Sequence, residues 1–378
     1  MFGKYQLTLF SIYFLISIFS INVIASDSLT TKKHFKNPLE FRKGRINFAV
    51  FPVASIDPAS GIELGIMPVF SISPKNDSII DDYYRSSSLA THVTYSTKNW
   101  ANIRSEGQFF TAKGDNITVF VQFLNAPDYF YGIGNDIINK QPSRYQNRYL
   151  KFGFETTKCF NKKHFVGLKA DFQSQDIADI EGNVLNPKIE GINGGNIIGV
   201  GPIYKFDTRN NVHYPSKGFY IQTSIVHFNT IGKSSNYFTI YSLDCRKYLK
   251  FFNSYYIAIQ GLLNSSSGNV PFYKLPTLGG KYNLRGISNK YMYIDKNVWY
   301  GQAEIRKMLY KRIGFVAFSG LGNTFSTWNN DMISKVKVVY GFGARIQLIP
   351  KDQINLRFDY AIGPNGDRGF YATIRESF

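Results

Sequence analysis

The last part of the chain, residues 336–378, alternates between apolar and polar side chains with a period of two. A turn at 350–352 divides it into two segments, whose apolar rows are Val336, Val338, Tyr340, Phe342, Ala344, Ile346 and Leu348, then Ile354, Leu356, Phe358, Tyr360 and Ile362. The intervening residues are polar or small, apart from Val339. Segments of about ten residues with this period are typical of a transmembrane β-barrel, whose strands face lipid on one side and water on the other. The edge strand of a soluble β-sandwich is the alternative.

The final segment closes on an aromatic residue, Phe378. Transmembrane barrels carry girdles of aromatic side chains at both membrane interfaces. We therefore expect Phe378 to lie in such a girdle, and the 33 Phe and 26 Tyr residues of the chain suit two of them.

Residues 1–25 have the features of a secretory signal peptide, since Lys4 precedes an apolar stretch from Leu7 to Ile24 and Ala25 lies at the expected cleavage position. An uncleaved anchor helix is the alternative. No later run of about 18 apolar residues follows, so a membrane protein of this sequence must cross as a closed barrel, which satisfies every backbone group internally. We predict the bacterial outer membrane as its location.

The formal net charge of +18 has two interpretations. One is a basic lumen or rim that attracts anionic partners, such as lipopolysaccharide or acidic segments. The other is solvated loops in a composition rich in Lys and Asn. The barrel periodicity argues against a nucleic-acid partner. Cys159 and Cys245 are interpreted as bystanders, although an oxidising compartment leaves a disulfide open.

The alternation predicts an all-β, antiparallel transmembrane barrel over 46–378, preceded by a short periplasmic tail over 26–45. An even number of strands places both ends of the barrel on the periplasmic side. Long connections are expected on the other side, near 126–144, 176–194 and 265–295, and the connection 73–86 is longer than this rule expects. The sixteen predicted strands lie near 46–56, 60–72, 87–98, 101–112, 116–125, 145–157, 164–175, 195–208, 217–228, 236–249, 254–264, 296–310, 313–325, 335–348, 353–362 and 368–378.

Three motifs carry a resemblance to a known family. The longest loop contains Leu278-Gly279-Gly280 and then Arg285-Gly286-Ile287. A periplasmic turn contains Asp207 and Arg209, followed by Pro215 and Gly218, and the first hairpin contains Phe51-Pro52-Val53 and Asp57-Pro58-Ala59-Ser60-Gly61. In these segments the chain resembles the bacterial surface antigen superfamily of outer-membrane barrels, which includes the BamA/TamA-type assembly factors.

The resemblance implies that the loop before the twelfth strand folds back into the lumen with Arg285 and Gly286 at its tip. It also implies that this arginine contacts acidic residues on the lumen wall. Glu304 is the first candidate, because Ala303 and Ile305 share the lipid face and leave Glu304 inside. The second expected acid is missing, since Gly320 stands where the family has Asp, so the loop lock is expected to be weaker or rebuilt.

Assembly factors of the family carry periplasmic polypeptide-transport-associated modules, and residues 26–45 are too few for one. The chain thus resembles the short, barrel-only members. We expect no enzymatic or metal site, because the five histidines are scattered, and no cofactor. Two hypotheses remain open. One is a barrel that assists insertion or translocation of client outer-membrane or secreted proteins, through a weak seam at Pro52 and Phe378. The other is a passive channel or structural barrel.

Overall fold

The computed structural model describes residues 40–43, 45–57, 61–73, 85–111, 113–136, 141–232, 236–252, 254–280, 283–310, 312–349, 353–374 and 376–378. The predicted signal peptide, residues 1–25, and residues 26–39 of the predicted tail lie outside the described residues. Every structural statement below concerns the unit that begins at Leu39.

The described residues form strands almost throughout. The strands are β1 (Glu40–Lys43), β2 (Ile46–Asp57), β3 (Gly61–Ile72), β4 (Ser87–Ser96), β5 (Ala101–Phe110), β6 (Asn116–Phe130), β7 (Ser143–Phe160), β8 (His164–Glu181), β9 (Gly195–Asp207), β10 (Gly218–Ile231), β11 (Tyr237–Lys250), β12 (Tyr255–Gly268), β13 (Asn297–Tyr310), β14 (Ile313–Phe325), β15 (Lys337–Ile349), β16 (Ile354–Ile362) and β17 (Arg368–Ile374). Three short 3₁₀ helices are η1 (Phe272–Lys274), η2 (Asn330–Met332) and η3 (Pro364–Gly366).

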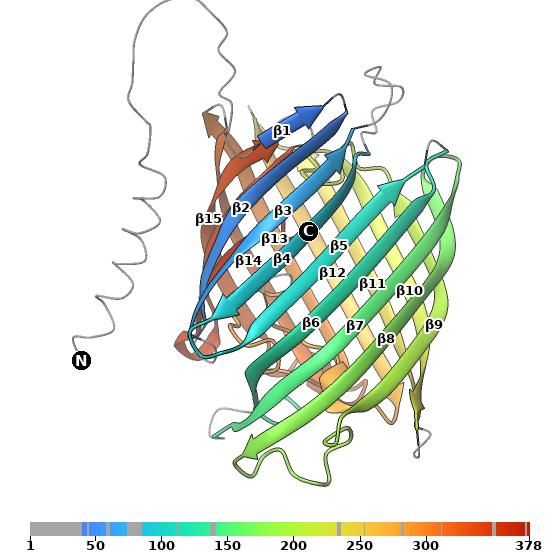
Figure 1. Ribbon diagram of the computed structural model, residues 1–378, viewed down its shortest axis with the longest axis vertical. Coiled ribbons are helices and arrows are strands. Elements are labelled where there is room, and N and C mark those ends of the chain that lie inside the picture. The colour runs from blue at the N-terminus through green and yellow to red at the C-terminus, as the bar shows by residue number, and fades with distance from the viewer. Residues whose placement is uncertain are drawn as a thin grey trace, which may run out of the picture. The chain divides into compact units, whose positions relative to one another are not determined.

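Strands β2 to β17 form a nearly closed antiparallel barrel, in which each strand pairs with the next along the chain (Figure 1). The all-β barrel of sixteen strands predicted from the sequence is therefore confirmed. No helix in the described part of the chain is long and apolar enough to span a membrane.

The two-residue alternation separates an outward apolar face from a lumen face. On β15, Val338, Tyr340 and Phe342 are more than half exposed on the outside, whereas Lys337 and Arg345 are buried inside. Val339, the exception in the sequence pattern, lies in the lumen and packs against the long loop. Val339 is apolar because the long loop, and not water, fills the lumen next to it.

The connections differ between the two ends of the barrel. One end, called the turn end, has short turns such as residues 161–163 between β7 and β8. The other, called the loop end, has the long connections 182–194 and 269–296. Bacterial barrels place short turns in the periplasm, so the turn end corresponds to the periplasmic side predicted above. Figure 1 shows the long loop after β8 at the end opposite β1. Cys159 and Cys245 are both free.

Several strand boundaries differ from the prediction. Strands β6 and β8 continue to Phe130 and Glu181, past their predicted ends at 125 and 175, and two other differences concern the first and last strands. The predicted tail contains a strand, because β1 pairs antiparallel with β2 from Glu40 opposite Ala49 to Lys43 opposite Ile46. The last predicted strand, 368–378, is shorter than expected, because β17 ends at Ile374. Both differences lie at the junction of the first and last strands, where they bear on the candidate site.

Candidate functional site

The connection from β12 to β13, residues 269–296, folds into the lumen. Its first part begins with η1, whose Phe272 is buried against Phe130 of β6 and Tyr145 of β7, with ring centroids 5.1 and 5.7 Å apart. These rings belong to a cluster that also contains Phe228 of β10 and Phe238 of β11. The loop therefore docks on one wall of the barrel through aromatic packing.

The loop tip is a compact fold of its own. Leu284 N–H donates to the Leu278 carbonyl at 3.1 Å and Gly280 N–H to the Ile287 carbonyl at 3.2 Å. Leu278, Leu284 and Ile287 are fully buried in a cluster with Tyr300 of β13. Gly280 has a φ of +115°, a left-handed conformation that glycine adopts without strain. The Leu-Gly-Gly motif thus brings the following residues into contact with the lumen wall.

Arg285 lies against the inner wall of the barrel and is fully buried. Its guanidinium forms an ion pair with Glu304 of β13 and a second one, at 2.6 Å, with Asp359 of β16. Its Cζ lies 3.6 Å from the ring centroid of Phe318 on β14. A buried guanidinium of this kind is stable only when carboxylates compensate its charge, so these contacts fix the loop tip in one position.

The second carboxylate comes from a strand that the resemblance did not indicate. At Gly320, where the family has Asp, a Cβ atom would come within 2.7 Å of Leu284 Cδ1 and 2.9 Å of Gln302 Cβ. Leu284 of the loop therefore occupies the space that an acidic side chain would need. Asp359 supplies the missing charge from β16, and the lock expected to be weaker or rebuilt is rebuilt.

Gly286 fits the loop tip against the end of β16. Its φ is +106°, and a Cβ atom there would lie 2.9 Å from the carbonyl oxygen of Ile362. Its N–H donates to the hydroxyl of Tyr371 on β17 at 3.1 Å. The residue type is thus required both by the backbone conformation and by the close approach of the wall.

The charge network continues from the loop to the residues after β17. Glu304 also pairs with Arg306 at 2.8 Å, and Arg306 Nη2 donates to the main-chain oxygen of Phe378 at 3.0 Å. Asp359 also pairs with Arg345 at 2.6 Å, and Arg345 pairs with Glu376 at 2.7 Å. Two chains of buried ion pairs therefore connect the loop tip to residues 376–378.

The placement expected for Phe378 is wrong. Its side chain is 4% exposed and packs in the lumen against Tyr248 and Ala258 instead of lying at a membrane interface. Glu376 is also buried in the lumen, and its carboxylate accepts a hydrogen bond from Asn355 Nδ2 at 3.0 Å. Arg306 and Arg345 hold Phe378 and Glu376 inside the lumen, so these residues do not continue β17.

The seam between β2 and β17 differs from every other strand junction of the barrel. The two strands are neighbours in the sheet, but in the described part of the chain no residue-by-residue ladder joins them. At the turn end, β1 pairs with residues 46–49 of β2. In the described residues, β1 therefore covers the first part of this edge of β2, and no continuous ladder joins the rest of the edge to β17.

Pro52 lies on that edge. Ser73 N–H donates to the Arg45 carbonyl, so the alternation of an antiparallel pair directs the backbone groups of odd-numbered β2 residues towards β3. Those of even-numbered residues, including position 52, face the seam. Since proline has no N–H, the seam edge of β2 lacks one donor, and the β2–β3 ladder is intact on the other side.

The predicted periplasmic turn is braced by charge and folds beneath the lumen. Arg209 donates to both carboxylate oxygens of Asp207, at 3.0 and 2.9 Å, and Arg85 donates to the same carboxylate at 2.8 Å. Burial would lower the pKa of Arg209, but the Asp207 carboxylate outweighs it and raises this pKa above its usual value. Pro215 is buried in the turn, and Gly218 has a φ of +115°, which suits glycine.

The loop and this turn leave a cavity of about 660 Å³ within the barrel. Its wall includes two ion pairs, Arg104 with Glu106 at 2.9 Å and Arg246 with Asp244 at 2.5 Å, and Phe378 also lines it. In the described part of the chain, no group of three or more His, Cys, Asp or Glu side chains is placed to hold a metal ion. The lumen is therefore partly filled and polar around its remaining space.

The Omp85 superfamily domain matches residues 85–378, which is most of the barrel together with the loop and its charged partners. This chain belongs to the Omp85 superfamily. Barrels of the Omp85 superfamily are outer-membrane proteins that act in assembly and transport. No curated protein matches the sequence of the chain.

Solved structures of Omp85-type barrels share the fold. BamA from Haemophilus ducreyi lacking POTRA domains 1–3 has a TM-score of 0.53 at 14% identity, over 87% of this chain and 68% of that one. CdiB from Acinetobacter baumannii has a TM-score of 0.51 at 14% identity, over 87% of this chain and 59% of that one. CdiB from Escherichia coli has a TM-score of 0.52 at 10% identity, over 88% of this chain and 63% of that one. This chain thus spans about three fifths of the CdiB chains.

The structure brings together two of the residues singled out in the sequence, Arg285 and Glu304, and adds Asp359, Arg306 and Arg345. The sequence pattern assigned Asp359 to the polar face of its strand, but it gave no indication of which lumen residues lie at the same height. The roles predicted for these residues in insertion or translocation stay predictions.

Proposed function

We propose that this Omp85 barrel lies in the bacterial outer membrane and assists insertion or translocation of outer-membrane or secreted proteins. The supporting observation is the seam between β2 and β17, which lacks the ladder found at every other junction of the described barrel. An exposed strand edge binds an incoming strand through main-chain hydrogen bonds. The edge of β2 beyond Ala49 is therefore the surface on which a client strand pairs.

The lumen network gives this seam a physical connection to the loop. Arg285 reaches Glu376 through Asp359 and Arg345, and it reaches Phe378 through Glu304 and Arg306. While the loop tip is locked, residues 376–378 are drawn into the lumen and cannot extend β17 along β2. Breaking the lock releases these residues, so the loop position and the seam are coupled.

A passive channel is the alternative. The missing Asp at Gly320 favoured it in the sequence, but Asp359 replaces that residue in the ion pair with Arg285. The loop and the periplasmic turn also occupy much of the lumen, and the space between them is a cavity of about 660 Å³. We therefore expect low conductance from the intact barrel in a planar bilayer.

A seam disulfide tests the proposal. Cys159 and Cys245 are first replaced by serine, and cysteine pairs are then scanned between residues 50–57 of β2 and 368–374 of β17. Each variant is reconstituted in lipid vesicles, and folding of an added client barrel is followed by its mobility on an unheated gel. Oxidation is expected to abolish the acceleration of client folding, and reduction to restore it.

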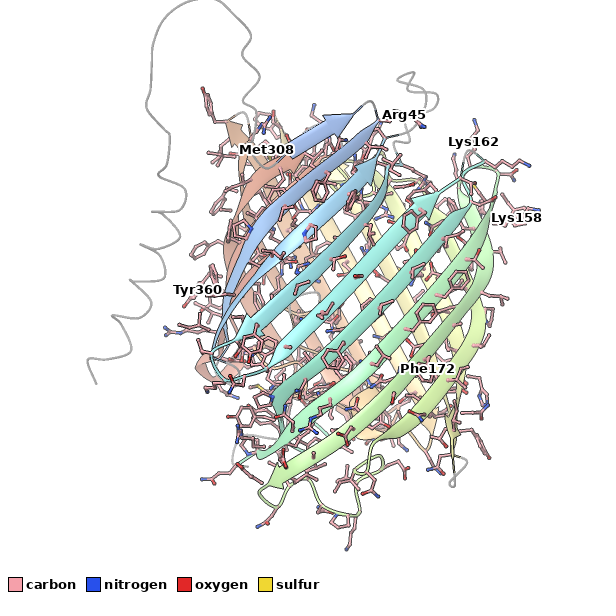
Figure 2. The ribbon with its side chains drawn as sticks, viewed as in Figure 1. Arg45, Lys158, Lys162, Phe172, Met308 and Tyr360 are labelled. Atoms are coloured by element: carbon pink, nitrogen blue, oxygen red, sulfur yellow. The ribbon has the colours of Figure 1, made fainter. Side chains whose placement is uncertain are left out.

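A matched disulfide controls for cross-linking itself. Phe152 of β7 and Phe172 of β8 are register partners on the outer face, far from the seam in sequence, and Figure 2 shows Phe172 on the strand wall. A cysteine pair there should leave client folding unchanged in both redox states. Full activity in a verified seam cross-link would contradict the proposal, and unchanged conductance in the same variant would favour the channel.

A further inference from the structure

The described residues at the turn end of the barrel include a cluster of positively charged side chains. Asp115 is the one carboxylate of the outer surface at this end between β5 and β14 in the described residues, and it accepts a hydrogen bond from the Cys159 N–H at 2.9 Å. The cations of the same surface, called the basic rim, are Lys113, Lys158, Lys162, Lys163, Lys217, Lys247, Lys250, Lys307 and Arg312. Figure 2 shows Lys158 and Lys162 at this end, together with Arg45.

At the loop end, three cations are paired with neighbouring carboxylates. Arg144 pairs with Glu181 at 3.3 Å, and Arg148 pairs with Asp176 at 3.5 Å. Lys335 pairs with Asp136 at 3.2 Å. By contrast, Lys158, Lys247 and Lys250 of the basic rim form no ion pair with a described carboxylate. These three rim lysines thus lack the carboxylate partners that Arg144, Arg148 and Lys335 have.

The basic rim lies beside the apolar face of the barrel. The Nζ atoms of Lys158 and Lys247 lie 5.9 and 5.6 Å from the ring centroids of Phe160 and Phe219. Lys307 Nζ lies 4.2 Å from the Tyr255 ring and donates to its hydroxyl at 3.0 Å. Exposed apolar residues of the same turns are Leu249, Phe251, Phe252, Leu309, Tyr310 and Ile313.

Lysines next to aromatic rings at the end of an apolar face lie at the interface between the bilayer and water. Their aliphatic stems lie along the apolar surface, and their ammonium groups extend to the polar interface. Aromatic girdles occur at that same level. The ammonium groups of Lys158, Lys247 and Lys307 are therefore placed among lipid phosphates rather than out in the aqueous phase.

We propose that the basic rim binds anionic phospholipid headgroups in the leaflet that faces the short turns. The proposal rests on the membrane location proposed above. Clustered lysines at a membrane surface attract anionic lipids electrostatically, and in the described residues Lys158, Lys247 and Lys250 of the rim are not paired with a carboxylate. A lipopolysaccharide partner would contact the loop end instead of the rim, and an acidic protein would require a basic surface away from the lipid face.

Spin-labelled lipids measure this preference directly. The protein is reconstituted in phosphatidylcholine vesicles, and the fraction of motionally restricted probe is compared for spin-labelled phosphatidylglycerol and phosphatidylcholine. Gel mobility before and after heating first verifies that the barrel has folded into the vesicles, which separates a failure of membrane insertion from a failure of lipid selectivity. The native protein should prefer phosphatidylglycerol by about two-fold or more, and high salt should reduce the preference.

The rim variant combines Lys158→Gln, Lys247→Gln and Lys250→Gln, and it should lose most of the preference. The control variant combines Lys98→Gln, Lys188→Gln and Lys296→Gln at the loop end, which removes the same charge, and it should keep the native value. Equal selectivity in the native protein and the rim variant would overturn the proposal. So would a preference lost only in the control variant, or a native protein that shows no lipid preference and instead binds an acidic periplasmic protein through the rim.

Discussion

The long loop is attached to the lumen by two kinds of contact. Near its start, Phe272 packs among aromatic side chains of β6, β7, β10 and β11, a contact that depends on buried area and not on charge. At its tip, Arg285 forms directional ion pairs with Glu304 and Asp359. The first attachment ends at the wall it touches, whereas the second continues through Arg306 and Arg345 to the end of the chain.

The two attachments should respond differently when they are disrupted. Aromatic packing tolerates small shifts, because dispersion contacts weaken gradually as atoms separate. A buried ion pair changes abruptly, because removing one partner leaves an uncompensated charge in the interior. We therefore expect the tip to control the residues that follow β17, and the start of the loop to contribute stability alone.

The largest effect is expected from Arg285→Met. The variant leaves Glu304 and Asp359 buried without their loop partner, so the free energy of unfolding should fall by about 3–5 kcal/mol. Urea titration in vesicles, read by the mobility of unheated samples, measures this loss. A cysteine introduced at Ser377 in a Cys159→Ser, Cys245→Ser background should become reactive towards a water-soluble thiol reagent. Unchanged reactivity would contradict the coupling.

Phe272→Ala removes the aromatic attachment instead. The lost contacts with Phe130 and Tyr145 and the cavity left behind should reduce the free energy of unfolding by about 3 kcal/mol. Reactivity of the cysteine at position 377 should stay at the native level, because the ion pairs of the tip are intact. Equal reactivity in this variant and in Arg285→Met would show that the two attachments are not distinct.

Gly286→Ala places a methyl group against Ile362 while keeping every charge. The positive φ and the 2.9 Å approach to the Ile362 carbonyl should together cost about 2 kcal/mol. Gly366→Ala is the matched control, because its φ is +76° and no atom lies within 4 Å of the new Cβ. It should cost about 1 kcal/mol from strain alone. If urea titration gives the same loss of unfolding free energy for both variants, the loop tip does not pack against β16.

The smallest effect is expected from Tyr371→Phe. The variant removes the hydroxyl that accepts from the Gly286 N–H, so the free energy of unfolding should fall by about 1 kcal/mol. Hydrogen exchange at the Gly286 amide should become faster. Tyr360→Phe, on the outer side of β16, serves as the control and should leave this amide unchanged. Native exchange in Tyr371→Phe would argue against this contact.

The sequence predicts the strands well because each strand lies between two different solvents. Alternation alone located all sixteen strands, and it placed Glu304 inside from the positions of Ala303 and Ile305. It could not identify Asp359 as a partner of Arg285, because two strands with the same period can pair in several registers. Register depends on contacts between strands, which a single strand pattern does not contain.

The differences at the first and last strands have the same origin. Residues 375–378 continue the length expected for a strand, and nothing in them indicates that Arg345 and Arg306 would draw Glu376 and Phe378 inward. The four residues of β1 are mostly polar and alternate weakly, so they carry no strand signal of their own. In both cases a tertiary contact, rather than the local pattern, decides where the strand begins or ends.

The strand β1 also limits aggregation of the chain before the barrel closes. An uncovered strand edge is a template for pairing with other chains and promotes aggregation. Because β1 is joined to β2 by a short turn, it covers residues 46–49 as soon as the hairpin forms, and Pro52 removes a donor from the stretch beyond. A newly exported copy therefore presents only a short and imperfect edge to its neighbours while the last strand has yet to arrive.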